Sequence, residues 1–363
     1  MPKWKEIAES VLADVREGRL RPGDRLPSDS VLAQQWRVSR MTAHRAMQEL
    51  QRLGVIARKR RSGTEVVAPE RKRTGFVAVV FPHTNDLLEI NYRRGISAAI
   101  PDEVHIISCD THDDPTREAA YLKRMLHEAD GIIWFPTCAP QNNTLFQRIT
   151  ETKTPVVCID KAPEGVQVDL VATDNYTSSL HALRALVQTG HRHIAHFTQH
   201  DVWVSSVRER YQAFADALAD LGDDDVQRWV RHFPIAQGME REHLIQLATD
   251  ALYALTHQQP PITAVFCLND YHLMATLEAC ARLEIRVPEQ LQILSFNDSL
   301  PLLPSIERSV HRIVQNAVTI GKLAAERLLR RMDGEVMEQR VIHVPAQFYP
   351  AEISGTLLQQ RTL

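Results

Sequence analysis

The sequence predicts a two-part protein: an N-terminal winged helix-turn-helix domain over residues 1–68, followed by a two-lobed parallel α/β domain over residues 75–350. Two observations predict it. First, two helices joined by a tight turn are followed at once by a basic hairpin. Second, short apolar runs alternate with amphipathic helices beyond residue 74, which is typical of a parallel sheet. Residues 69–74 are polar and indicate a linker, and residues 351–363 are expected to form a tail.

The first 68 residues indicate three helices and a hairpin. The first helix has a buried stripe of apolar residues at helical spacing: Ile7, Val11, Leu12 and Val15. Ser28 suits the N-cap of the second helix, and residues 37–38 form the turn after it. The third helix runs from about Arg40 to Leu53, and the hairpin follows over residues 55–67. The third helix is expected to bury Ala43, Ala46, Met47, Leu50 and Leu53.

Side chains that can bond to DNA occupy the first turns of the third helix and the hairpin. They are Ser39, Arg40, Thr42, His44 and Arg45 on the helix and Arg61 on the hairpin, and Gly63 of the hairpin is a further candidate DNA-binding residue. Arg bonds guanine in bidentate fashion, whereas Thr and His bond a base or a phosphate. Residues 1–68 hold 14 Lys and Arg against 8 Asp and Glu, while the whole chain has a net charge of −3. The basic run at residues 58–61 could by itself be a solvated hairpin tip, but beside the helix pair it favours phosphate contact.

The larger domain shows strands and helices in alternation. The strand candidates are Phe76–Val80, Val104–Ile107, Gly131–Phe135, Val156–Ile159, Val171–Ala172, Ile194–Phe197, Ala264–Leu268 and Leu291–Phe296. Helices are expected between them, for instance over Asn175–Thr189, Val207–Leu221 and Tyr271–Arg282. This alternation predicts parallel sheets, and about 275 residues are enough for two lobes.

Polar side chains follow many of these strands. They are Asp110, Asp160, Asp174, Asn269, Asp270, Asn297 and Asp298. Ligands of open parallel sheets bind at the carboxyl ends of the strands, and Asp and Asn together suit a ligand with many hydroxyl groups. The alternative is that each side chain caps the helix behind it. We expect capping by Asp174 and Asp298, and ligand contact by Asp160, Asn269 and Asn297.

Composition and motifs exclude several classes of protein. No apolar run reaches the ~18 residues of a membrane span, and the N-terminus lacks the apolar core of a signal peptide. Five scattered cysteines without a C-x-x-C pair predict buried thiols in a reducing cytoplasm. A metal site built from His191, His193, His196 and His200 is not expected, because His193 and His196 straddle a strand start with the wrong periodicity to converge. Without a nucleophile elbow, a phosphate-binding Gly loop or a His-Glu-x-x-His motif, we expect neither an enzyme nor a cofactor.

The N-terminal part resembles the GntR family of bacterial regulators over nearly all of residues 4–67. The segments that carry the resemblance are Leu20–Ser28, Val38–Thr42 and Gly63-Thr64. The resemblance implies that Ser39, Arg40 and Thr42 contact an operator and that the hairpin, the wing, reaches the minor groove or the backbone. The sequence departs from the family at three positions, where Ser30 and His44 each replace a frequent Arg and Arg61 replaces Gly. The base preference is therefore expected to differ from that of typical members.

The rest of the chain resembles the sensor domain of the LacI family, which is similar to periplasmic sugar-binding proteins. The resemblance covers about residues 75–350 and is carried by Asp174–Tyr176, Gly190–Ala195, Val207–Phe214, Ala264–Asp270 and Val287–Asp298. It implies an effector cleft lined by Asp160, Arg208 or Arg210, Asn269, Asp270 and Asn297. Asn297 stands where the family mostly has Asp, and Ser295 where it mostly has Gly. A neutral side chain at 297 weakens the case for a plain neutral sugar and leaves room for an acidic or modified one.

A GntR-type head joined to a LacI-type body resembles the domain arrangement of AraR-like regulators. The expected function is an effector-responsive transcriptional regulator of the cytoplasm, a repressor of carbohydrate-utilisation genes. Its expected partners are a palindromic double-stranded DNA operator, a sugar or sugar-like effector and a second copy of the chain, because palindromic half-sites mirror a two-fold axis. The alternative is a DNA-binding protein whose sensor domain has become a protein-interaction platform without a small ligand, and only Asn297 supports it.

Overall fold

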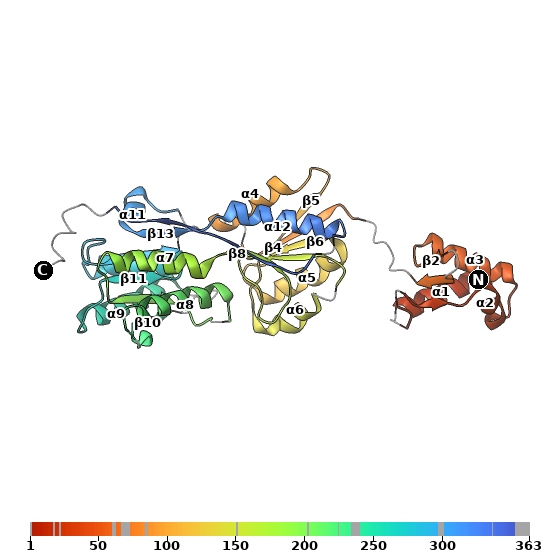
Figure 1. The fold of residues 1–363 in the computed structure, drawn as a ribbon, viewed down its shortest axis with the longest axis horizontal. Helices are drawn as coiled ribbons and strands as arrows, with labels where there is room; N and C mark the ends of the chain where they lie inside the picture. Colours follow the sequence, from red (N-terminus) through yellow and green to blue (C-terminus); the bar gives the residue numbers. More distant parts are fainter. Residues whose placement is uncertain are drawn as a thin grey trace. The chain divides into compact units, whose positions relative to one another are not determined.

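The computed structural model divides into two compact units, Met1–Arg73 and Thr74–Leu363 (Figure 1). The structure describes residues 2–16, 19–21, 23–59, 63–66, 73–83, 86–149, 152–201, 203–223, 225–233, 240–296, 301–335 and 337–352.

The N-terminal unit consists of three helices and a small antiparallel sheet. Its helices are α1 (Lys3–Arg16), α2 (Asp29–Trp36) and α3 (Arg40–Arg52). Its strands are β1 (Arg25–Leu26), β2 (Ile56–Lys59) and β3 (Gly63–Val66), in the order β1-β3-β2. The β2–β3 pair is the hairpin that the sequence predicts, and β1 adds a third strand that the sequence analysis did not identify.

Local chemistry explains where the helices of this unit begin and end. Ser28 caps α2 by accepting the backbone N–H of Val31, as predicted. Arg37 ends α2 in the left-handed region at φ 50°, which makes the tight turn before α3. The apolar face of α3 is buried against α1 and α2, and its members are Ala43, Ala46, Met47 and Leu50. The prediction that Leu53 is buried was wrong: it lies just beyond the last turn of α3, and 42% of it is exposed.

The larger unit contains two lobes, each built on a six-stranded sheet. The first lobe has the sheet order β14-β8-β7-β6-β4-β5, in which all neighbours pair in parallel. Its strands are β4 (Phe76–Phe81), β5 (His105–Asp110), β6 (Gly131–Trp134), β7 (Val156–Ile159), β8 (Asp169–Thr173) and β14 (Val341–Val344). Its helices are α4 (Leu87–Ala99), α5 (Pro115–Glu128), η1 (Pro140–Asn142), α6 (Asn143–Ile149) and α12 (Ala317–Met332).

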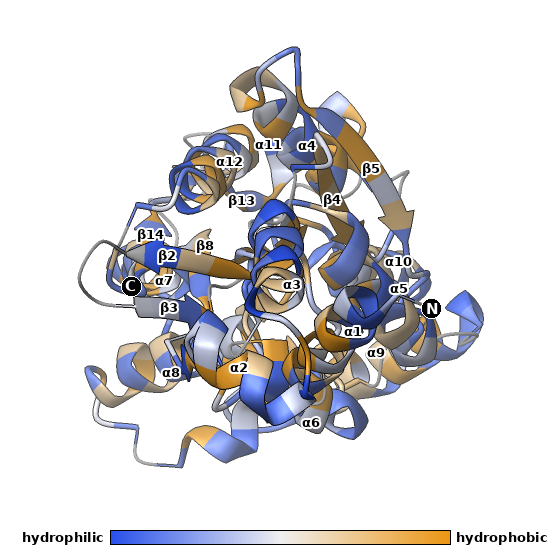
Figure 2. Cartoon of the chain, turned by 90° about the vertical axis from the view of Figure 1, so that its right-hand side faces the viewer, coloured by the Kyte–Doolittle hydropathy of each residue, from blue (hydrophilic) through white to orange (hydrophobic). Residues whose placement is uncertain are grey.

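Alternate residues of β4 enter two different cores of the first lobe. Val77 and Val79 pack with residues of α4 and α12, whereas Ala78 and Val80 pack with residues of α5 and α6. The sheet is therefore covered on both faces, which is why its strands are largely hydrophobic (Figure 2).

The second lobe has the sheet order β10-β9-β11-β12-β13-β15, with an antiparallel edge strand, β15. Its strands are β9 (Ile194–Thr198), β10 (Val230–His232), β11 (Ala264–Cys267), β12 (Gln292–Phe296), β13 (His311–Val314) and β15 (Gln347–Tyr349). Its helices are α7 (Asn175–Gln188), α8 (Ser205–Ala219), η2 (Val226–Trp229), α9 (Arg241–His257), α10 (Asp270–Arg282) and α11 (Pro304–Ser309). Helix α7 packs on α8, and α9 packs on α10.

Three segments cross between the lobes, since the chain leaves the first lobe after β8, returns to it for α12 and β14, and ends in the second lobe with β15. The crossings lie between β8 and α7, between β13 and α12, and between β14 and β15. Hydrogen bonds join them: the backbone N–H of Asp174 donates to the carbonyl of Val344 at 2.9 Å, and the Thr173 hydroxyl donates to Gln315. The crossing segments thus form one connected hinge region.

The fold class is as predicted, with differences at particular elements. The three predicted helices of the second lobe match α7, α8 and α10 to within two residues at each end. The sequence pattern does not predict β10, β13, β14 and β15, because these strands are only three or four residues long and each contains His, Arg or Gln. Asp110, expected after a strand, is the last residue of β5.

Candidate functional site

One candidate site is the outward face of α3 in the N-terminal unit. Ser39 caps α3: its hydroxyl accepts the backbone N–H of Thr42 at 3.2 Å and lies 2.9 Å from the Thr42 hydroxyl. Ser39 and Arg40 are exposed, and Thr42 is half-buried. The first turn of α3 therefore presents hydroxyl and guanidinium groups to solvent, away from the face that packs on the core. Met41, which the sequence analysis passed over, is 76% exposed between them.

The other predicted DNA contacts of this unit have distinct surroundings. The Arg45 guanidinium stacks over the Trp4 ring at 4.6 Å from its centroid. His44 and Arg58 both contact Asp29, with Nδ1 of His44 2.7 Å from one carboxylate oxygen. Gly63 opens β3 with φ +93°, a backbone conformation that favours glycine. Arg61 lies outside the described residues.

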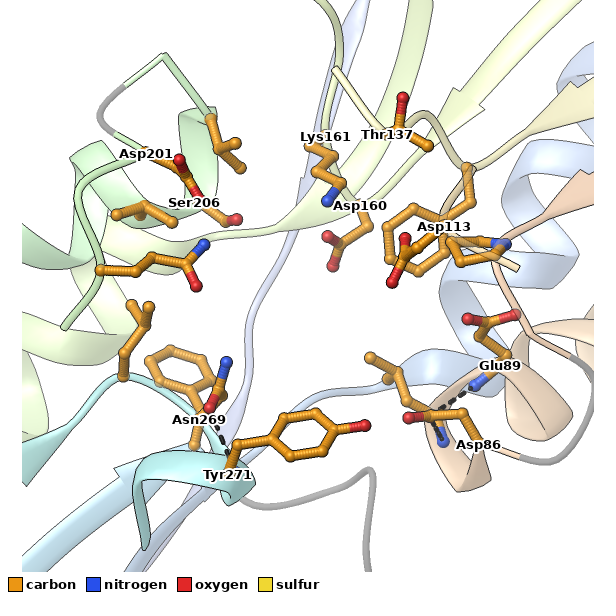
Figure 3. A pocket seen from close by; sticks show the side chains of 18 of the residues that line it. Asp86, Glu89, Asp113, Thr137, Asp160, Lys161, Asp201, Ser206, Asn269 and Tyr271 are labelled. Atoms are coloured by element: carbon orange, nitrogen blue, oxygen red, sulfur yellow. Dashed lines mark hydrogen bonds between the residues drawn. The ribbon is translucent and has the colours of Figure 1, made fainter. Parts of the chain in front are cut away.

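The second candidate site is a pocket of about 480 Å³ between the two lobes of the larger unit (Figure 3). It is lined by segments that follow β4, β5, β6 and β7 in the first lobe and β9 and β11 in the second, together with Phe296 at the end of β12 and Gln315 after β13. Five carboxylates line it, from Asp86, Glu89, Asp113, Asp160 and Asp201. Aromatic rings line it as well, from Phe135, Trp203, Tyr271 and Phe296. The position at the strand ends is the one predicted for a ligand.

Asp160, which directly follows β7, is held in a specific orientation. Its backbone has φ 70°, a conformation that non-glycine residues adopt rarely. The Tyr92 hydroxyl donates to its carboxylate at 3.1 Å, and only 7% of Asp160 is exposed. Figure 3 shows its carboxylate directed into the pocket beside Lys161. The carboxylate is thus fixed before any ligand arrives.

Arg210 and Asn269 line the pocket from the second lobe. The Arg210 guanidinium donates to the Asn175 side chain at 2.9 Å and to the Leu268 carbonyl at 2.7 Å, and it stacks 3.4 Å from the centroid of the Phe296 ring. Asn269 caps α10 by accepting backbone N–H groups, and it lines the pocket as well. The cap and the ligand-facing position, which the sequence analysis treated as alternatives, coincide in this side chain.

The remaining predicted effector residues do not join them in the described pocket. Arg208 is exposed on α8, and Asp270 is buried in the first turn of α10; neither lines the pocket. Of the two arginines left open by the sequence, the structure therefore brings Arg210 to Asp160 and Asn269. Asn297 and Asp298 lie outside the described residues. Asp174 caps α7 by accepting the backbone N–H of Thr177, as predicted.

Burial changes the ionisation of acids on the first-lobe side of the pocket. Burial raises the pKa of Glu89 to about 8, even though its carboxylate accepts the backbone N–H of His83. Burial also raises the pKa of Asp86, which caps α4, and that of Asp201. Glu89 is therefore mostly protonated at neutral pH.

The cationic groups of the pocket lie close to these acids. A hydrogen bond to Asp113, at 3.1 Å from Nε2, raises the pKa of His83 to about 8. Burial favours a higher pKa for Asp113, but the His83 hydrogen bond and the charge of Lys161 outweigh it and lower the pKa. Burial disfavours the charged form of Lys161, yet neighbouring acidic groups, with Cys138 and Asp160 foremost, raise its pKa overall. His83, Lys161 and Arg210 thus place cationic groups among the acids of the pocket.

Several lining residues were not predicted from the sequence, although some of them lie close to residues that were. Lys161 follows Asp160, and Tyr271 follows the predicted pair Asn269-Asp270. Asp113 lies three residues beyond Asp110, the residue that the strand-end rule selected. Asp86 and Glu89 had no such signal, because they lie on α4 and its cap rather than directly after a strand.

The described residues contain no group of three or more His, Cys, Asp or Glu arranged to hold a metal ion. His191 and His196, two of the histidines weighed for a metal, instead contact the Thr263 hydroxyl and the Phe266 carbonyl. All five cysteines are buried and form no disulfide. None of the described helices is long and apolar enough to cross a bilayer.

Comparison with known families identifies both units. Residues 3–66 match the bacterial regulatory proteins of the gntR family, and residues 183–350 match the periplasmic binding protein-like domain. The chain is therefore a transcriptional regulator in which a GntR-type DNA-binding helix-turn-helix is joined to a sensor domain with a sugar-binding fold.

Individual relatives match all or part of the chain. The chain is 23% identical to the arabinose metabolism transcriptional repressor of Geobacillus stearothermophilus, over 94% of this chain and 93% of that protein. It is 27% identical to the HTH-type transcriptional repressor PurR of Aliivibrio fischeri, over 66% and 68%. A transcriptional regulator CelR-cellobiose complex has a similar fold, with a TM-score of 0.64, 21% identity and coverage of 87% and 91%. These relatives are transcription regulators rather than enzymes.

Proposed function

We propose that this protein is an effector-responsive repressor of carbohydrate-utilisation genes, without catalytic activity, that acts in the cytoplasm. The observation that carries the proposal is a preorganised polar pocket between two lobes in a chain that also has a DNA-binding head. The name of the arabinose metabolism repressor and the cellobiose complex of the similar regulator support a sugar-linked role.

The effector that suits the pocket best is a neutral compound with several hydroxyl groups. The carboxylate of Asp160 accepts hydrogen bonds from hydroxyls, the guanidinium of Arg210 donates them, and Asn269 can do both. Tyr271, which points across the pocket in Figure 3, offers a ring face to the apolar side of a sugar. A sugar acid would bring a further acidic group to a pocket that several acidic side chains already line, so it suits the pocket less well.

The DNA-binding face of the proposal is the outward side of α3 together with the wing. Arg40 is the proposed base reader, with Ser39, Thr42 and Arg45 at bases or phosphates and Gly63 and Arg61 in the wing at the backbone. Two heads of a homodimer would engage the half-sites of a palindromic operator. An effector that favours one arrangement of the lobes would alter operator affinity, typically by ~1–3 kcal/mol of coupling free energy.

The effector half of the proposal is tested by thermal melting of the full chain with a panel of neutral sugars, amino sugars and sugar acids. A compound whose dissociation constant lies well below the concentration used should raise the melting temperature of the protein by several degrees. Asp160→Asn should abolish that rise while preserving the fold, because the amide oxygen still accepts from Tyr92. Glu103→Gln, at an exposed acid of the same lobe outside the pocket, is the matched control. If no sugar in the panel affects the wild-type protein, the sensing role is refuted.

The DNA half is tested separately with the operator recovered from a random duplex library. Arg40→Ala should weaken operator binding by roughly 1–3 kcal/mol and leave binding to random DNA less affected. Equal losses on both kinds of DNA would remove the base-reading role from Arg40.

A further inference from the structure

His44 lies on the outward face of α3, one helical turn beyond Arg40. Residues four apart on a helix share a face, so the two side chains point the same way. The opposite face of α3 packs on the core through residues such as Ala43 and Met47. About a third of the His44 side chain, 36%, is exposed. His44 is therefore placed beside the proposed base reader.

Asp29 holds the imidazole of His44 by one nitrogen. Nδ1 of His44 lies 2.7 Å from one carboxylate oxygen of Asp29, whose side chain is only 17% exposed. The other carboxylate oxygen accepts from the Arg58 guanidinium at 2.8 Å. Asp29 opens α2 and Arg58 lies on β2, so a single carboxylate ties three elements of the head together. An ionised carboxylate only accepts hydrogen bonds. Nδ1 also lies 3.4 Å from Nη1 of Arg58, but its contact with the carboxylate is far shorter, so Nδ1 carries the proton.

This arrangement sets the tautomer of the neutral ring. A neutral imidazole that donates from Nδ1 accepts at Nε2. Among the described residues, none forms a hydrogen bond with Nε2 of His44. In the major groove, an acceptor on the protein is matched by an exocyclic amino group, which only cytosine (N4) and adenine (N6) present there.

We propose that His44 is a specificity-determining residue that accepts a hydrogen bond from the amino group of a cytosine or an adenine, and that Asp29 is the positioning residue that sets its tautomer. The proposal rests on the proposed binding of DNA through α3. His44 then determines the preferred base at one position of each half-site, next to the position that Arg40 reads. Guanine is disfavoured at that position because its major-groove edge offers acceptors.

The test is selection of binding sites from a randomised double-stranded DNA library by the full chain, followed by sequencing. Wild-type protein should enrich cytosine or adenine at one position of each half-site, and the selected sequences tell the two bases apart. His44→Ala should erase a preference of roughly 2- to 13-fold at that position only, as expected for a single hydrogen bond. His44→Arg should change the preferred base there to guanine, because Arg donates to guanine O6 and N7.

The role of Asp29 is tested with the same library. Asp29→Ala should reduce the preference at the His44 position, and Asp29→Glu should restore part of it. Glu9→Ala is the matched control: it also removes a carboxylate from the head, at an exposed site on α1, and should leave the base preference intact. Removing a negative charge near the phosphates raises the affinity for every duplex. A gain in affinity that Asp29→Ala and Glu9→Ala share is therefore due to the lost charge.

Three outcomes would overturn the proposal. One is enrichment of guanine by the wild-type protein at the position that His44→Ala alters. Another is an equal loss of affinity for all duplexes in His44→Ala, which indicates a phosphate contact. The third is an unchanged base preference in both His44 variants. These variants leave the Asp29–Arg58 pair intact, so they test the proposal even if Asp29→Ala unfolds at a lower temperature. Failure of the wild-type protein to enrich any sequence would instead refute the proposed DNA binding itself.

Discussion

At the scale of single residues, one buried carboxylate holds three elements of the larger unit together. Asp169, at the start of β8, is buried with 3% exposure and accepts from Arg327 and Arg331, each at 2.8 Å. It also accepts the backbone N–H of Arg340 at 2.9 Å. Burial alone would raise its pKa, but these donors outweigh burial and lower it. One carboxylate thus joins β8, α12 and the segment before β14.

At this scale we expect Asp169→Ala to destabilise the sensor unit strongly. Removing one partner of a buried ion pair leaves the other charge uncompensated, which costs roughly 3–5 kcal/mol of unfolding free energy. Arg327, only 9% exposed, is the charge left behind. Asp220→Ala removes an exposed partner of Arg184 and should cost no more than about 1 kcal/mol. Urea unfolding of both variants measures the difference, and equal effects would contradict it.

Among the elements, the packing of α4 on α12 depends on two glycines at the contact. A Cβ added to Gly95 would lie 2.0 Å from the Val318 carbonyl oxygen, and one added to Gly321 would lie 2.1 Å from that of Tyr92. Only hydrogen fits at either position. The close approach also determines where Tyr92 lies, and Tyr92 donates to the pocket residue Asp160.

Gly321→Ala should therefore push α12 away from α4. Overpacking of this kind typically costs 1–3 kcal/mol, and the obstacle here is backbone, so we expect a loss of at least about 2 kcal/mol of unfolding free energy. Ser97→Ala on the exposed side of α4 is the control and should stay within about 0.5 kcal/mol of wild type. Thermal melting with and without the effector should show the stability loss together with weaker ligand binding, and wild-type stability of Gly321→Ala would refute this account of the contact.

On the scale of the whole molecule, ionisable groups in both lobes make stability depend on pH. Burial lowers the pKa of His196 to about 3 and those of His272 and His311 to about 4, from an ordinary value of 6.5. Between about 4 and 6.5 the unfolded chain binds protons at these three rings that the folded chain does not. Stability must therefore fall as the pH drops through this range.

The opposite holds above pH 6.5. His83 and Glu89 both have a pKa of about 8 in the folded protein, above their ordinary values, so the folded chain keeps protons that the unfolded chain releases. Glu89 acts in this direction from pH 4.5 upward, but the three buried histidines outweigh it below 6.5. Urea unfolding of the sensor should thus show maximal stability near pH 6.5, and Glu89→Gln should flatten the alkaline decline. A stability that rises from pH 6.5 to 8.5 would contradict this assignment.

The sequence by itself determined the class of each unit and much of its local chemistry. Hydrophobic period and turn residues depend on near neighbours in the chain, so they sufficed for the helix pair of the head, for the strand–helix alternation and for the caps at Ser28 and Asp174. The strand-end rule likewise selected Asp160 and Asn269, because the ends of parallel strands necessarily meet at one edge of a sheet.

Only the tertiary structure decided which side chains meet. Arg208 and Arg210 are equivalent in the sequence, but the helical phase of α8 against its lobe buries Arg210 beside Phe296 and leaves Arg208 exposed. Asp86 and Glu89 reach the pocket from α4, and Asp29 meets His44 and Arg58 across three elements of the head. These contacts join residues far apart in the chain, and their geometry depends on how whole elements pack, which no local pattern of residues encodes.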